Sequence, residues 1–196
     1  NELFPVEEDL GVDKIWFKDT DDSIKLLASY VDKDSILGID KNWPARFLLR
    51  LMEFNAAKGY TNGSDIVDAL RMIKDQEEIE LLRRASIIND KAIERLINEI
   101  SPEFSEKDME DKLKQIYKEL GADGVSFDPI ISYGPNCADP HHACDDSKLK
   151  DGDSIVIDIG CIKDSYCSDM TRTVFFKKVS EKHKEIYNIV LEANRK

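Results

Sequence analysis

The fold of the C-terminal part of this chain is decided by residues 154–176, which read SIVIDIGCIKDSYCSDMTRTVFF. Isoleucine recurs at every second position from 155 to 159, a spacing typical of a strand that buries one face. Lys163-Asp164 has the polar character of a tight turn, and a second β-like segment follows over residues 165–176. The stretch therefore predicts a β-hairpin whose first strand spans residues 154–161.

The predicted hairpin brings two carboxylates together. A two-residue loop at Lys163-Asp164 pairs Ile162 with Ser165 and places Asp158 directly opposite Asp169. Opposed residues have Cβ atoms about 4.5–5.5 Å apart, where like charges destabilise a sheet, and a slipped register would make the pair diagonal. Bound cations would remove the repulsion. The alternative is an exposed polar sheet face, on which both acids pair with lysine or water.

The same stretch resembles the signature of the pita-bread metallopeptidases, the group that includes methionine aminopeptidase, aminopeptidase P, prolidase and creatinase. The matching elements are Asp-x-Gly at residues 158–160 and Tyr-x-x-Asp-x-Thr-Arg-Thr at residues 166–173. Residues 127–142, FDPIISYGPNCADPHH, resemble the segment that delivers the family's substrate-binding histidine, and residues 71–79 resemble the entry to the catalytic domain of the Xaa-Pro branch. The resemblance covers the whole chain, closely after residue 70 and loosely before it.

The resemblance implies roles for four residues. Asp158 would bind one metal and Asp169 would bridge two, with Mn, Co or Zn as the two divalent ions of an intact site. His141 would be the catalytic histidine that contacts substrate and helps polarise the scissile bond, and His142 is a weaker substrate-binding candidate. From the residues alone, a loop histidine beside proline is more often simply solvated.

The resemblance also implies an activity. The expected enzyme is an Xaa-Pro dipeptidase or aminopeptidase that hydrolyses the bond between an N-terminal residue and proline in a peptide or dipeptide, as a homodimer. An α/β domain at the front is unlike methionine aminopeptidase, and both aspartates being present is unlike the metal-free creatinase. The alternative is a non-catalytic pita-bread module that binds peptides or protein partners.

The ligand set of this chain is incomplete by comparison with the family. The dinuclear site also needs a histidine and two glutamates from the second half of the fold, and nothing after Thr173 resembles those motifs. His183 lies in the last helical pattern, where a solvated role is expected. The chain starts at Asn1 without methionine and stops at Lys196 inside a helical pattern. We therefore expect part of a longer protein, carrying part of an active site and inactive alone.

The expected fold is a partial α/β layer followed by the first half of an α+β pita-bread catalytic domain. Residues 1–72 would form a partial creatinase-like N-terminal domain and residues 73–196 the N-terminal half of the catalytic domain. The pattern predicts the elements of both parts. Strands are expected at 15–17, 36–39, 66–72 and 125–133, the last broken by Pro129, and helices after Asp22 and Pro44, at 76–100 and 105–120, and from 180 onward.

The charge, the lengths of the apolar runs and the cysteine spacing argue against several classes of function. The net charge is −12, with 40 acidic against 28 basic residues, which argues against nucleic-acid binding because phosphates require a basic face. No apolar run approaches the ~20 residues that span a bilayer, and no secretory signal opens the sequence. A cytoplasmic protein is therefore expected. The four cysteines form no CxxC pair, so a structural zinc site is not indicated.

Overall fold

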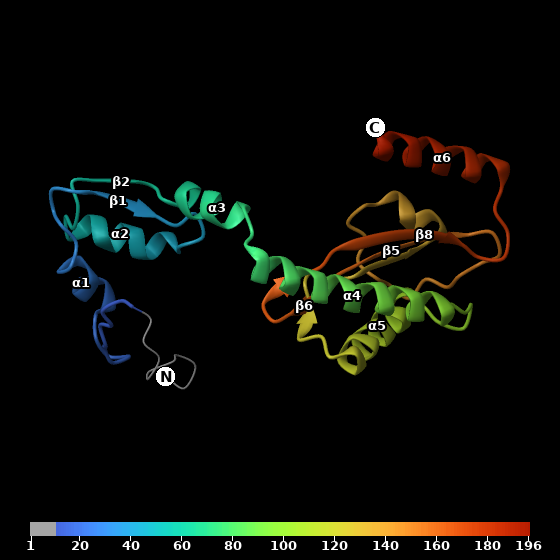
Figure 1. Ribbon diagram of the computed structural model, residues 1–196, viewed down its shortest axis with the longest axis horizontal. Helices are drawn as coiled ribbons and strands as arrows, with labels where there is room; N and C mark the ends of the chain where they lie inside the picture. The colour runs from blue at the N-terminus through green and yellow to red at the C-terminus, as the bar shows by residue number, and fades with distance from the viewer. Residues whose placement is uncertain (1–10) are drawn as a thin grey trace. The chain divides into compact units, whose positions relative to one another are not determined.

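The computed structural model describes residues 11–196. The chain divides into two compact units, Asn1–Ile73 and Lys74–Lys196, and Figure 1 labels their main elements. This division falls one residue beyond the boundary expected from the sequence. The assignment of the first unit to a creatinase-like domain stays a prediction.

The described part of the first unit is a small α/β layer. Its elements are α1 (Ser23–Ala28), β1 (Ile36–Ile39), α2 (Ala45–Glu53), β2 (Gly59–Asn62) and α3 (Ser64–Met72). Strands β1 and β2 pair in parallel. The predicted starts of two helices are confirmed, because Asp22 caps α1 with its side chain and Pro44 directly precedes α2.

Two of the strands predicted in this unit are not present in the structure. Residues 15–17 lie in no helix or strand, and residues 66–72 belong to α3. A short apolar run does not distinguish a strand from a helix, and here the apolar residues Ile66, Val67 and Leu70 have helical spacing. Strand β2 was not expected, because its sequence GYTN contains a single large apolar residue.

The second unit opens with two helices that the sequence predicts closely. Helix α4 (Gln76–Asn98) begins with a capping box in which Asp75 and Glu78 satisfy each other's backbone N–H groups. Helix α5 (Glu106–Leu120) begins with the equivalent box of Ser105 and Asp108. It ends at Gly121, whose φ of 80° is left-handed and suits glycine.

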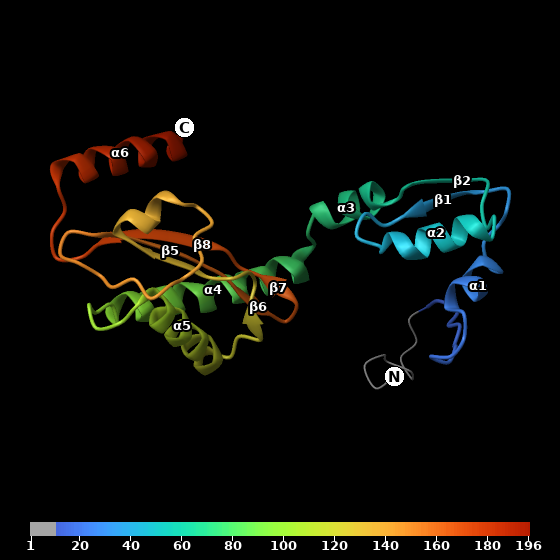
Figure 2. The same cartoon turned by 180° about the vertical axis from the view of Figure 1, so that it is seen from behind.

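Both helices pack on one face of an antiparallel sheet, as Figures 1 and 2 show. The sheet has the order β4 (Ile130–Tyr133), β5 (Ser154–Ile159) and β8 (Met170–Phe175). The alternating isoleucines of β5 are buried against α4 and α5. Buried Asn89 joins the layers: its Nδ2 donates to the Ile159 carbonyl, and its Oδ1 accepts from the Tyr117 hydroxyl. The opposite face of β5, which carries Asp158, points away from the helices.

Shorter elements complete the unit. A second sheet has the order β3 (Gly124–Val125), β6 (Cys161–Lys163) and β7 (Tyr166–Cys167). The 3-10 helix η1 (Gly134–Ala138) follows β4, and helix α6 (Glu181–Arg195) follows β8 and is capped by Ser180 near its predicted start. All four cysteines are free thiols.

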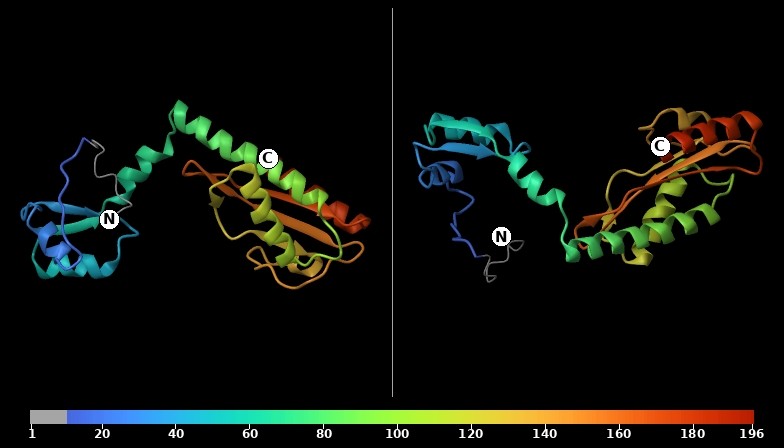
Figure 3. Two further views of the ribbon diagram at one scale, coloured as in Figure 1. Left: turned by 90° about the horizontal axis from the view of Figure 1, so that it is seen from below. Right: turned by 45° about the horizontal axis from the view of Figure 1, so that its top comes forward.

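The hairpin exists, but its predicted register is wrong. The turn is Asp164-Ser165, so that Lys163 pairs with Tyr166 and Asp158 pairs with Thr171. Both turn residues have positive φ, 49° and 67°, as a type I′ loop requires. The loop still has two residues but lies one residue later, which moves every cross-strand partner by two and keeps each side chain on its expected face. The hairpin appears in orange shades in Figure 3.

Candidate metal centre

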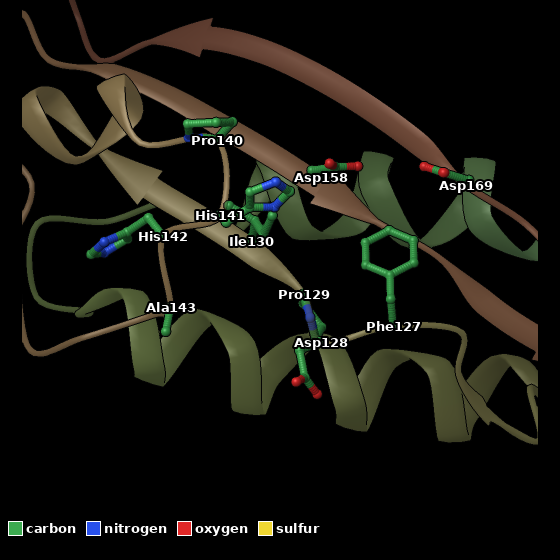
Figure 4. Close-up of a pocket in the computed structure, with 10 residues that line it drawn as sticks. All are labelled: Phe127, Asp128, Pro129, Ile130, Pro140, His141, His142, Ala143, Asp158 and Asp169. Atoms are coloured by element: carbon green, nitrogen blue, oxygen red, sulfur yellow. The ribbon is translucent and has the colours of Figure 1, made fainter. Parts of the chain in front are cut away.

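A pocket of about 460 Å³ lies in the second unit, and all four residues predicted to be functional, Asp158, Asp169, His141 and His142, contribute to its lining. Asp158 and Asp169 lie on one side of it, and His141 enters from the loop that follows η1 (Figure 4). Apolar side chains contribute much of the remaining lining: Phe127, Pro129, Ile130 and Pro140. The fold thus collects two carboxylates, an imidazole and an apolar surface in one place.

Asp158 is partly buried in the middle of β5, on the face opposite the isoleucine core. Its Oδ1 is buried and has no hydrogen-bond partner among the described residues. A buried carboxylate oxygen without a partner costs free energy. A divalent cation would provide the missing contact, so the residues present fit a metal ion at this position.

Asp169 is exposed and lies in the short segment between β7 and β8. Because Thr171 is the partner of Asp158, Asp169 is its diagonal neighbour. Figure 4 shows the two carboxylates pointing toward each other. Two close acids of this kind form an oxygen-rich site suited to divalent cations.

The glycine of the Asp-x-Gly element permits a close approach of the two chain segments. A Cβ on Gly160 would lie 2.1 Å from the Ser168 carbonyl oxygen and 2.2 Å from Ser126 Oγ. The same carbonyl accepts a hydrogen bond from Ser126 Oγ at 2.9 Å. A side chain at position 160 would therefore separate the segments that carry Asp158 and Asp169.

The two neighbouring histidines have different surroundings. His141 is exposed on the pocket, and its backbone N–H donates to Asp139 Oδ1 at 2.9 Å. The His142 ring points away from the two aspartates in Figure 4, and its Nε2 lies 2.7 Å from Glu106 Oε2. The structure therefore brings His141, but not the ring of His142, to the carboxylate pair.

Glu106, His142 and Asp145 form a second cluster, in which potential ligand atoms all lie within 4.8 Å of one another. Sequence reasoning did not single out Glu106. An acid in the first turn of a helix is common because it is stabilised by the helix dipole, so nothing in the local pattern distinguishes this one. Only its complete burial does so.

A family model with the description Metallopeptidase family M24 matches residues 80–196. The chain belongs to this family. Membership in M24 implies the use of divalent metal. Family membership agrees with the resemblance found in the sequence and with the carboxylate pair at the pocket. The identity of the metal and the role of each residue stay predictions.

Proteins similar to this chain include an Xaa-Pro dipeptidase, a prolidase and an X-Pro aminopeptidase. An Xaa-Pro dipeptidase of Pyrococcus horikoshii is 35% identical over 195 residues, which is 100% of this chain and 54% of the relative. A prolidase structure from Pyrococcus furiosus has a TM-score of 0.81 at 34% identity, covering 91% of this chain and 52% of that one. An X-Pro aminopeptidase structure from Thermotoga maritima has a TM-score of 0.79 at 31% identity, covering 89% and 50%.

The M24 chain thus spans about half the length of the relatives it matches. These likenesses confirm the expected fold class, a partial α/β layer followed by part of a pita-bread domain. These relatives include both a dipeptidase and an aminopeptidase. Among the residues that the structure describes, no helix combines the length and apolar character needed to cross a bilayer.

Proposed function

We propose that the protein containing this chain is a dinuclear metallopeptidase that hydrolyses the bond between an N-terminal residue and proline. The observation that carries the proposal is the pair of carboxylates at one pocket, one of which has a buried oxygen without a partner among the described residues. Relatives named Xaa-Pro dipeptidase support the substrate class. They do not favour the alternative of a non-catalytic binding module.

Asp158 and Asp169 are the proposed metal ligands of this chain. Bound divalent ions, with Mn, Co and Zn as the candidates, would supply Lewis acidity and an activated water. The carboxylates would hold the ions and balance their charge. Asp158 is held in place by pairing of β5 on both sides, with β4 and with β8, so its orientation is already set in the folded chain.

His141 is the proposed catalytic and substrate-binding histidine. It lies on the same pocket as the carboxylates but makes no side-chain hydrogen bond to either in the described structure. An imidazole in this position is free to contact the carbonyl group of a bound peptide. The apolar lining formed by Phe127, Pro129 and Pro140 suits a proline ring, which offers no N–H group to be satisfied.

The site of this chain is proposed to be partial. Transition-metal sites use several nitrogen and oxygen donors in a fixed geometry, whereas the proposed metal ligands at this pocket are only the two aspartates Asp158 and Asp169. Further ligands would come from residues outside this sequence, and the chain alone would be inactive. We also propose a homodimer in the cytoplasm, in keeping with the resemblance.

The test uses the intact protein, loaded separately with Mn²⁺, Co²⁺ or Zn²⁺, and three peptides: an Xaa-Pro dipeptide, an Xaa-Pro-Xaa tripeptide and an Xaa-Ala dipeptide. Cleavage of a proline substrate but not of Xaa-Ala is expected, and the dipeptide and tripeptide separate dipeptidase from aminopeptidase activity. Metal-dependent activity with no preference for proline would overturn the proposed specificity.

Asp158→Asn and Asp169→Asn should each lower kcat by about 100–1,000-fold, since loss of a single electrostatic contact at a reacting centre typically has an effect of this size. Asp111→Asn, on a side chain that is 83% exposed on α5, is the matched control and should retain wild-type activity. Full activity and metal binding in either site variant would contradict the assignment of the ligands.

A further inference from the structure

Glu106 is a completely buried acid at the first position of α5, with no exposed side-chain surface. The helix dipole favours a carboxylate at this end of a helix. Burial of a charge nevertheless costs free energy unless hydrogen bonds replace the lost water. A buried acid that persists in a fold must therefore be well satisfied by its neighbours.

Four nitrogen atoms surround the Glu106 carboxylate. Oε1 accepts from the backbone N–H of Tyr133 at 2.7 Å and from Asn136 Nδ2 at 3.0 Å. Oε2 accepts from the backbone N–H of Asp145 at 3.1 Å and lies 2.7 Å from His142 Nε2. One side chain thus connects the end of β4 and the helix η1 to both ends of the segment 142–145.

These contacts describe a hydrogen-bonded cluster better than a metal site. Ligand atoms about 2.0–2.2 Å from a tetrahedral metal are separated by more than 3 Å, whereas the contact between Nε2 and Oε2 is 2.7 Å. Both carboxylate oxygens of Glu106 are already occupied by donors. A carboxylate accepts hydrogen bonds, so the short contact assigns a proton to Nε2 of His142.

The contact between Glu106 and His142 affects the adjacent residue, His141. The His142 ring is held against Glu106, on the side away from the carboxylate pair, while His141 faces the pocket (Figure 4). Among the described residues, His141 itself is held only by the hydrogen bond from its backbone N–H to Asp139 Oδ1, and the backbone N–H of His142 donates to the Asp139 carbonyl at 3.3 Å. The position of the loop at His141 therefore depends on how firmly the next residue is fixed.

We propose that Glu106 and His142 are positioning residues: their hydrogen bond fixes the loop that presents His141 to the pocket. This replaces the expectation that His142 binds substrate, and its catalytic consequence rests on the proposed peptidase function. The buried pair acts through His141 and does not touch the reacting groups. Precise support of this kind typically changes activity or affinity by about 10–100-fold.

The test combines ring NMR of the histidines with kinetics of the intact protein. This sequence contributes only three histidines, and His183, stacked on Phe175 in the region of α6, is the internal reference. In the wild type, His142 should show the Nε2-protonated tautomer. His142→Leu and Glu106→Gln should both shift or broaden the His141 ring signals and leave those of His183 unchanged.

Kinetics separate positioning from binding. His142→Leu should lower kcat about 10–100-fold with unchanged Mn²⁺ affinity, whereas His142→Gln, whose amide N–H can still reach Glu106, should restore most of kcat and the wild-type His141 signals. Unchanged His141 signals and kcat in both His142→Leu and Glu106→Gln would overturn the proposal. Loss of Mn²⁺ binding in these variants would overturn it in favour of a metal site.

The spectra remain decisive if the proposed function fails. If the wild-type protein cleaves no proline peptide, movement of the His141 signals still supports the positioning role and their constancy rejects it. If one variant does not fold, the other carries the same measurement, because the two residues form the same hydrogen bond.

Discussion

Asp158 and Asp169 share one face of the β5–β8 hairpin although they are not cross-strand partners. Asp158 pairs with Thr171, which follows Asp169 by two residues. Diagonal neighbours in an antiparallel pair are about 7–8 Å apart, compared with about 4.5–5.5 Å for opposed residues. The observed register therefore leaves more room between the carboxylates than the expected one, and cations can occupy that room.

Asp158→Asn should stabilise the metal-free protein. The substitution removes a carboxylate whose Oδ1 is buried without a partner among the described residues, so the free energy of unfolding should rise by about 1 kcal/mol. It should also abolish the stabilisation that Mn²⁺ bound at the proposed site would give to the folded wild type. Urea unfolding with EDTA and with Mn²⁺ measures both effects. A less stable Asp158→Asn protein in EDTA would contradict the prediction.

Gly160→Ala should strongly destabilise the hairpin. The added Cβ would lie 2.1 Å from a backbone carbonyl oxygen, and overpacking against backbone costs about 1–3 kcal/mol or more because the strands must move apart. Gly124→Ala is the matched control, since a Cβ there meets nothing within 4 Å. Thermal unfolding of both variants tests this. Equal melting temperatures would show that the close contact is not structurally required.

Ser165→Gly should stabilise the protein by about 1 kcal/mol, because Ser165 has a φ of 67° and the left-handed region is unfavourable for residues with a Cβ. Ser86→Gly places the same change in the middle of α4, where the lower helix propensity of glycine should cost about 0.5 kcal/mol. Urea unfolding of the two variants should give opposite signs. A destabilised Ser165→Gly protein would mean that the turn is not the one described.

Asp108→Asn should lower the free energy of unfolding more near neutral pH than at acid pH. Hydrogen bonds from the backbone and hydroxyl of Ser105, with a further contribution from Lys148, lower the pKa of Asp108 to about 2. A depressed folded-state pKa gives stability that is present above the ordinary value of 3.8 and is lost as the pH falls toward 2.

The stability difference between wild type and Asp108→Asn should therefore be constant from pH 7 to about 5 and shrink below pH 4. Urea midpoints measured over this range test the trend, and a carbon NMR titration of the Asp108 carboxyl group gives its pKa directly. Asp111→Asn, on an exposed side chain of the same helix, is the matched control. A difference that grows with acid would have the wrong sign.

Local features were predictable from the sequence because their physical causes are local. The capping boxes at Asp75 and Ser105 and the left-handed Gly121 satisfy backbone groups within a few residues, so the helix limits follow from the pattern. The alternating isoleucines of β5 likewise determine which face is buried. The motif around Asp158 predicted the family for the same reason, since its spacing lies in one continuous stretch.

Tertiary structure decided the features that depend on distant partners. The observed turn is Asp164-Ser165 instead of the predicted Lys163-Asp164, and the strand register differs accordingly. At this turn the N–H of Asp164 donates to Asp123, 41 residues away in the chain. Residues 66–72 lie in helix α3, although a short apolar run of this kind fits a strand or a helix equally well. The partners of Glu106 lie 27 to 39 residues from it. No local pattern encodes such contacts, because burial of that carboxylate exists only when β4, the His142 loop and α5 have come together.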